Sequence, residues 1–111
     1  MTQDSDFVVV STAVGEEAEA RKLAERIVEE RLAACVQYVS VQSTYRWKGA
    51  IESTSEYLLL AKTRASLAGE LTVLIEKVHS YELPEIIVTP ITGGSEKYLK
   101  WIGKQTGEDQ G

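Results

Sequence analysis

Hydrophobic and polar positions follow one another along the chain in blocks that predict alternating strands and helices. Residues 7–13, FVVVSTA, are apolar and β-branched, which is typical of a strand buried on both faces. Residues 16–31 instead space their apolar side chains three and four positions apart, as one face of a helix requires. The opposite face carries almost only charge, and we expect it to be solvated. The apolar positions of this helix are Ala20, Leu23, Ala24, Ile27 and Val28.

The middle of the chain predicts a long β-hairpin. The segments AACVQYVSVQSTYRW and AIESTSEYLLLAKT are rich in β-branched and aromatic residues. Lys48 and Gly49 lie between them and suit a two-residue turn, because glycine accepts positive φ. Each arm has about 12 to 14 residues, or roughly 40 Å of strand at about 3.3 Å per residue. The arms are therefore longer than the core of so small a domain.

A hairpin of this length places Tyr45, Trp47 and Ile51 near a protruding tip, away from their own core. Large apolar groups on such a ribbon indicate a surface for a partner, and an uncovered strand edge attracts another chain. We therefore expect self-association. The alternative is a shorter, bulged hairpin whose tip folds back on the domain.

The remaining blocks complete the fold. Residues 66–78 have the spacing of a second helix, EIIVTPI at 85–91 reads as a fourth strand, and SEKYLKWIGK at 95–104 as a short helix with Ser95 as its N-cap. The order β-α-β-β-α-β plus a final helix predicts an α+β fold of the ferredoxin-like kind. Both helices that connect strands should cover the same face of the sheet, which leaves the other face open.

Length and composition limit the organisation of the chain. Its 111 residues predict one domain, 1–111, with a folded core of about 7–104 and mobile ends at 1–6 and 105–111. A net charge of −5 opposes binding to nucleic acid. The single cysteine excludes an intrachain disulfide, and no apolar run approaches the length of a membrane span. These features, with an acidic N-terminal segment unlike a secretory signal, predict a soluble, cytoplasmic protein.

Candidate chemistry is sparse, and no enzyme is predicted. Cys35 has no base beside it in the sequence, so a small buried thiol is the simpler interpretation than a nucleophile. TGGSEK at 92–97 lacks the spacing of a phosphate-binding loop. His79, the single histidine, lies in VHSYELPEI. It either caps the end of the second helix or joins Glu76, one turn back, and Glu82 and Glu85, just downstream, in a weak divalent-cation site.

Several stretches in a fixed order resemble the CutA family of divalent-cation tolerance proteins. Together they extend over nearly the whole folded chain, and none is specific alone. They are ERLAACV at 30–36, YRWKGAIE at 45–52, LLLAKT at 58–63, HSYELPEIIVTPI at 79–91 and YLKWI at 98–102.

The resemblance implies a homotrimer whose long hairpins pair between subunits, and a shape similar to that of PII signalling proteins. It implies copper or another divalent cation as ligand. The residues it suggests for the metal are His79, Glu85 and Ser11. Members credited with copper binding carry a cysteine at the position of Ser11 and a second histidine at the position of Val78, and a proline usually stands where this chain has Ser80. These departures predict weak binding.

The resemblance also suggests a cleft between subunits, lined by Cys35, Lys62 and Tyr81. Two main functions follow as expectations. The first is a non-enzymatic tolerance protein that binds divalent cations weakly. The second is a PII-like regulator that binds a small effector or a partner protein in the cleft. A purely structural or assembly role is the third.

Overall fold

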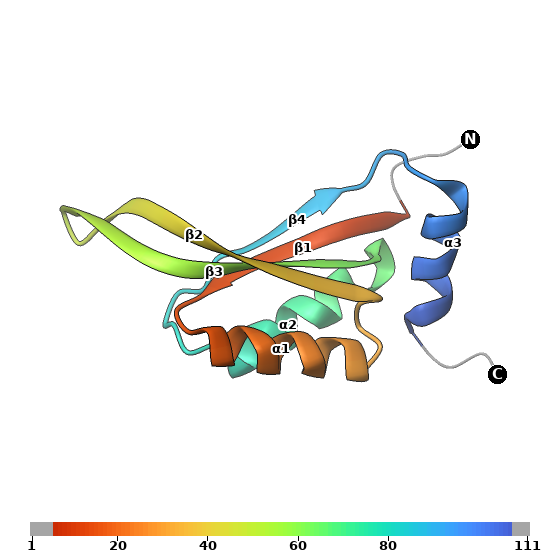
Figure 1. The fold of residues 1–111 in the computed structure, drawn as a ribbon, viewed down its shortest axis with the longest axis horizontal. Coiled ribbons are helices and arrows are strands. Elements are labelled where there is room, and N and C mark those ends of the chain that lie inside the picture. Colours follow the sequence, from red (N-terminus) through yellow and green to blue (C-terminus); the bar gives the residue numbers. More distant parts are fainter. Residues whose placement is uncertain (1–5, 108–111) are drawn as a thin grey trace.

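Four strands form one antiparallel sheet in the order β2-β3-β1-β4, with α1 and α2 against one face and α3 across one end (Figure 1). The structure is a computed structural model and describes residues 6–107. The element order is the predicted one, and this is the ferredoxin-like order. The elements are β1 (Phe7–Val14), α1 (Glu17–Glu29), β2 (Cys35–Trp47), β3 (Ala50–Arg64), a 3-10 turn (Ala65–Leu67), α2 (Ala68–Val78), β4 (Ile86–Pro90) and α3 (Glu96–Gln105).

The core lies between the sheet and its two covering helices. From β1 it takes alternate residues, Val8, Val10 and Val14, because successive side chains of a strand point to opposite faces. Helices α1 and α2 add the apolar faces that the sequence predicts, including Ile27 and Leu71. The expectation that the first strand is buried on both faces is wrong for this chain: Phe7, Val9 and Ser11 are only half-buried, since no helix of residues 6–107 covers the open face.

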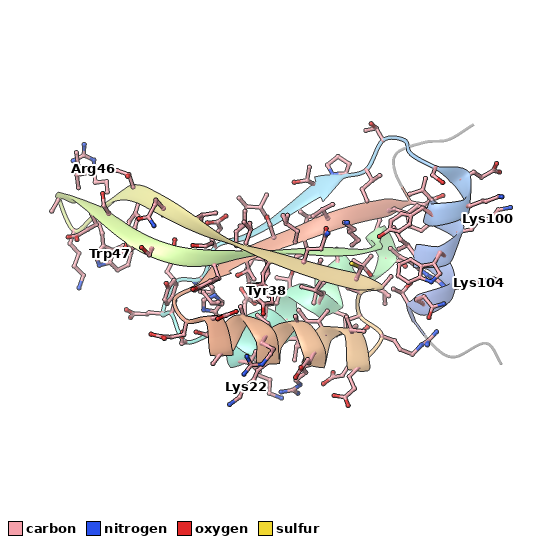
Figure 2. All side chains as sticks on the ribbon, in the orientation of Figure 1. Lys22, Tyr38, Arg46, Trp47, Lys100 and Lys104 are labelled. Atoms are coloured by element: carbon pink, nitrogen blue, oxygen red, sulfur yellow. The ribbon has the colours of Figure 1, made fainter. Side chains whose placement is uncertain are left out.

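The hairpin is as long as predicted. Strand β2 has 13 residues and β3 has 15, and their register runs without interruption from Cys35↔Lys62 to Trp47↔Ala50. Lys48 and Gly49 form the turn with φ of 51° and 85°, as a type I′ turn requires. The bulged, folded-back alternative is therefore wrong. Figure 2 shows Arg46 and Trp47 at the tip of the ribbon, and the longest dimension of the molecule is 48 Å.

Two arginines hold residues 103–107, the last part of the chain that the structure describes. The Arg64 guanidinium donates to Thr106 Oγ1 at 2.9 Å and to the carbonyls of Gly103 and Thr106. The Arg31 Nε donates to the carbonyl of Gly107 at 2.8 Å. Thr106 is only 1% exposed, so contacts continue past the expected boundary at residue 104. The ends 1–5 and 108–111, which the sequence predicts as mobile, lie outside the described residues.

Candidate functional site

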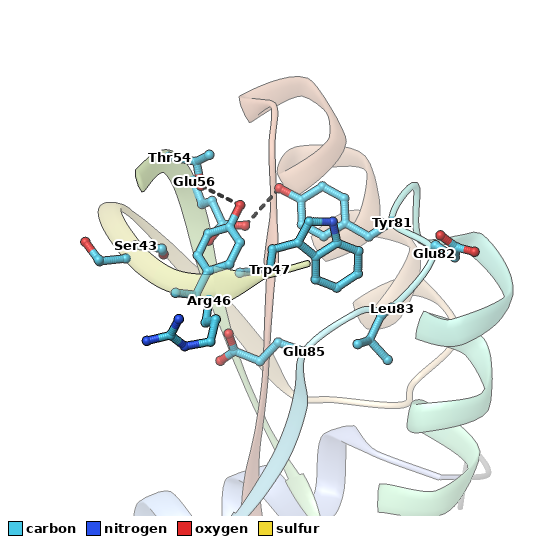
Figure 3. Close-up of a pocket in the computed structure, with 12 residues that line it drawn as sticks. Ser43, Arg46, Trp47, Thr54, Glu56, Tyr81, Glu82, Leu83 and Glu85 are labelled. Carbon is cyan, nitrogen blue, oxygen red and sulfur yellow. Dashed lines mark hydrogen bonds between the residues drawn. The ribbon is translucent and has the colours of Figure 1, made fainter. Parts of the chain in front are cut away.

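A hollow of about 820 Å³ lies where the outer half of the hairpin faces the loop after α2. Figure 3 shows its side chains converging from β2, from β3 and from this loop. The lining combines aromatic rings with carboxylates, and one arginine, Arg46, also reaches it. The rings belong to Tyr45, Trp47 and Tyr81, and the carboxylates to Glu56, Glu82 and Glu85.

Glu56 is the buried charged group of the hollow. It is 8% exposed, although it lies on β3 opposite Val41, where the hairpin leaves the domain. Its Oε2 accepts a hydrogen bond of 2.8 Å from the hydroxyl of Tyr81. Burial, and next this hydrogen bond to the Glu56 carboxylate, raise the pKa of Tyr81 to about 12. Tyr81 therefore keeps its proton and remains a donor to Glu56 through the physiological range of pH.

Gly15 makes room for the Tyr81 hydroxyl. A Cβ at this position would lie 3.2 Å from the phenol oxygen, closer than ordinary contact. Because Gly15, between β1 and α1, has no side chain, the phenol of Tyr81 can reach Glu56.

His79 ends α2 and uses both nitrogens of its ring. Its Nε2 lies 2.9 Å from the carbonyl of Ala13, which can only accept, so this nitrogen carries the proton. Its Nδ1 accepts from the backbone N–H of Tyr81 at 3.0 Å. Its own N–H donates to the carbonyl of Ile75, which confirms the predicted position of His79 at the cap of the helix. A metal ion would reach an imidazole lone pair only after one of these two ring contacts opened.

The loop that carries Tyr81 is also tied to α1. Ser80 donates from its backbone N–H at 3.1 Å and from its hydroxyl at 2.9 Å to the two carboxylate oxygens of Glu19. The rings of His79 and Tyr81 are 4.9 Å apart. One wall of the hollow is therefore fixed from β1, α1 and β3 at once.

The structure divides the predicted site residues into four places, one of which is the C-cap of α2 with His79. Tyr81 and Glu85 line the hollow. Cys35 and Lys62 are opposite each other at the other end of the hairpin, where Lys62 Nζ donates to Gln37 at 2.7 Å. Lys62 is six residues from Glu56 along β3, which is about 20 Å of strand. Within one chain, Tyr81 and the pair of Cys35 and Lys62 do not meet.

Ser11 lies on the open face of the sheet, where its hydroxyl donates to the carbonyl of Ile87 at 3.5 Å. Between residues 6 and 107, no three side chains of His, Cys, Asp or Glu are grouped closely enough to hold a metal ion. In the same part of the chain, no helix is long and apolar enough to cross a membrane.

The sequence prediction missed Glu56. The signal was available, because Glu56 shares its strand parity with Leu58 and Leu60, so it stands on an apolar face. A carboxylate in such a row indicates a polar partner that reaches it from another element.

Comparison with known proteins decides the family. The model of the CutA1 divalent ion tolerance protein family matches residues 8–105. The chain belongs to this family. The Arabidopsis thaliana "Protein CutA, chloroplastic" is 47% identical over 100 residues, which are 89% of this chain and 55% of that protein. The structure of the divalent cation tolerance protein Cut A1 from Thermus thermophilus is 41% identical, covers 91% of this chain and 99% of its own, and has a TM-score of 0.88.

The same comparisons correct the expected location. The structure of the CutA protein from Archaeoglobus fulgidus is described as periplasmic; it is 31% identical, covers 89% of this chain and 97% of its own, and has a TM-score of 0.87. With a chloroplastic relative in Arabidopsis thaliana as well, the expected cytoplasmic location is not supported for this chain. The chain spans about half the length of the plant and animal relatives that it matches.

Proposed function

We propose that the chain acts in tolerance of divalent cations as a non-enzymatic homotrimer that binds these ions weakly. The observation that carries the proposal is the family match over residues 8–105. The uninterrupted hairpin and the open sheet face support the trimer, and the carboxylates around the hollow support weak binding of cations.

The support for assembly comes from apolar surface on the open face. Val39 is 51% exposed and Ile87 is 52% exposed, and both share this face with Ser11, Leu58 and Leu60 by register. Strands β2 and β4 are the edges of the sheet and present unpaired backbone groups. A second and third copy would cover both features.

The support for weak binding comes from ligand type. Glu82 and Glu85 stand at the hollow and offer oxygens that hard or borderline divalent ions accept. His79 adds an imidazole once one of its two ring hydrogen bonds opens. The loss of that hydrogen bond lowers the affinity for the metal ion. Ser11, on the open face, would be a ligand only together with residues of another copy.

Native mass spectrometry of the protein titrated with Cu(II) tests this proposal. We expect up to three copper ions per trimer, and a loss of affinity of at least about tenfold in His79→Gln or Glu85→Gln. The matched control is Glu52→Gln, a carboxylate on the same hairpin that does not line the hollow. No copper binding in the wild type, or equal binding in all variants, would overturn the proposed site.

A second candidate is a PII-like regulator that binds a small effector. The observation that favours it is the hollow itself, with three aromatic rings and one buried carboxylate. Concave, partly aromatic surfaces with a few convergent polar groups are typical of small-molecule sites. Cys35 and Lys62 would take part only if a neighbouring copy brought its end of the sheet to this hollow.

A further inference from the structure

We propose that the hollow binds a small organic ammonium ion, with a primary amine that donates to Glu56 and an alkyl chain that packs on the aromatic rings. This inference rests on the second candidate function and names its class of effector. It differs from a metal site because the ligand is recognised by N–H donors and ring faces.

Glu56 provides the first argument. Its Oε2 accepts from Tyr81, and its other carboxylate oxygen receives no hydrogen bond within residues 6–107. In the same region the one ion pair is Arg26–Glu30, so no cation of residues 6–107 forms an ion pair with Glu56. Although Glu56 is only 8% exposed, its second carboxylate oxygen is not fully buried, so this oxygen is open to a ligand in the hollow. An ammonium group would supply both the charge and the missing donors.

The aromatic rings provide the second argument. Tyr45 and Trp47 project from β2, and Tyr81 from the facing loop, so rings border the hollow on two sides. The negative faces of such rings attract cations. The chain already shows this attraction at one of them, because the Lys48 ammonium lies 5.9 Å from the centre of the Trp47 ring.

The charge balance selects the sign of the ligand. Three carboxylates, Glu56, Glu82 and Glu85, face one guanidinium, Arg46, so the lining carries a formal charge of −2. The whole chain carries −5. Phosphates, nucleotides and carboxylic acids are therefore repelled from this hollow, whereas amines are attracted.

The fluorescence of Trp47 tests the proposal directly. The chain has two tryptophans, so Trp101→Phe leaves Trp47 as the only indole. We would titrate this protein with 1,4-diaminobutane in the presence of a metal chelator. The controls are 1,4-butanediol, which has the same length without charge, and NaCl at matched ionic strength. We expect a saturable change in Trp47 fluorescence with the diamine and none with either control.

Two further variants assign the contact. In Glu56→Gln the amide oxygen still accepts from Tyr81, so the loop keeps its anchor, and we expect binding to weaken by about 10- to 100-fold. Tyr45→Leu changes an exposed residue and should weaken binding about two- to fivefold. In Glu52→Gln, the matched control, binding should change by less than about twofold.

The proposal is overturned if the diamine gives no change beyond that of NaCl, as it would if a neighbouring subunit filled the hollow. It is also overturned if Glu56→Gln and Tyr45→Leu both bind like the wild type. Because the chelator removes metal ions, the diamine titration is independent of the copper titration. A wild-type protein that binds copper but not the diamine would refute this inference and leave the proposed cation site standing.

Discussion

The hydroxyl of Tyr81 lies 2.8 Å from Oε2 of Glu56, and this hydrogen bond joins the loop after α2 to the strand that leads into the hairpin. The two residues are 25 positions apart in the sequence. The contact fixes one edge of the hollow. Because it also raises the pKa of Tyr81, a titration of this tyrosine reports whether the contact is formed.

We expect one of the five tyrosines to titrate near pH 12, with Tyr81→Phe removing that step. Glu56→Gln should lower this pKa towards 10.0 without reaching it, because the burial remains. Ultraviolet absorbance of the phenolate measures both. A tyrosine titration that is identical in the wild type and in Glu56→Gln would contradict the contact.

The same shift predicts how stability depends on pH. The pKa of Tyr81 is raised on folding, so its contribution is fully present below pH 10 and is lost as pH rises towards 12. Because Tyr81 is 37% exposed, we expect this contribution to be only about 1 kcal/mol. Urea unfolding of the wild type and of Tyr81→Phe across this interval measures the difference. This difference in the free energy of unfolding should vanish as pH approaches 12.

His79 should exist as the tautomer with its proton on Nε2. The carbonyl of Ala13 requires a donor there, and the N–H of Tyr81 requires an acceptor at Nδ1. Long-range ¹H–¹⁵N correlation of the imidazole distinguishes the two nitrogens at neutral pH. Detection of the proton on Nδ1 would contradict the arrangement, and with it the argument that metal binding must open a contact.

The turn of the hairpin gives a matched pair of glycine substitutions. Gly49 has a φ of 85°, so Gly49→Ala should destabilise the protein by about 1 kcal/mol. Gly69 lies in α2, and a Cβ added there would meet no atom within 4 Å, so Gly69→Ala should stabilise the protein by about 0.5 kcal/mol. Thermal unfolding at one fixed protein concentration measures both. The same sign for the two changes would contradict the assigned backbone.

Arg64 should stabilise the end of α3. Arg64→Met keeps the aliphatic stem but removes the hydrogen bonds to Thr106 and Gly103, so we expect a loss of about 2 kcal/mol. Amide exchange at Gly107, which donates to the carbonyl of Arg31, should accelerate. Arg21→Met, at an exposed position of α1, is the control and should change stability by less than about 0.5 kcal/mol. An unchanged rate of amide exchange at Gly107 in Arg64→Met would contradict the role given to the Arg64 hydrogen bonds.

The fold was predictable because its signals are local. Apolar spacing located both covering helices, Ser95 located the start of α3, where it accepts from the N–H of Tyr98 at 3.2 Å, and Lys48-Gly49 located the turn. The hydrogen bond from Arg64 to Thr106 was not predictable, because it depends on where two segments that are distant in the sequence meet.

The candidate site was predictable only in part. Loop residues Tyr81 and Glu85 were identified, and the structure places them at the hollow. The grouping of Cys35 and Lys62 with Tyr81 depended on contacts between chains, which strand pairing within one chain does not determine. Glu56 stands among apolar residues of its strand, but its partner could not be predicted, because the Tyr81 side chain that donates to it is 25 residues away in the sequence.

The mass of the assembly in solution tests the central claim most directly, because we propose that other copies of this chain cover the open face and the protruding hairpin. The chain has a mass of 12.3 kDa, so sedimentation analysis should find three times that value, about 37 kDa, from micromolar concentrations upward. A species of 12.3 kDa at all concentrations would contradict the trimer and leave Val39, Ile87 and the tip of the hairpin without a partner.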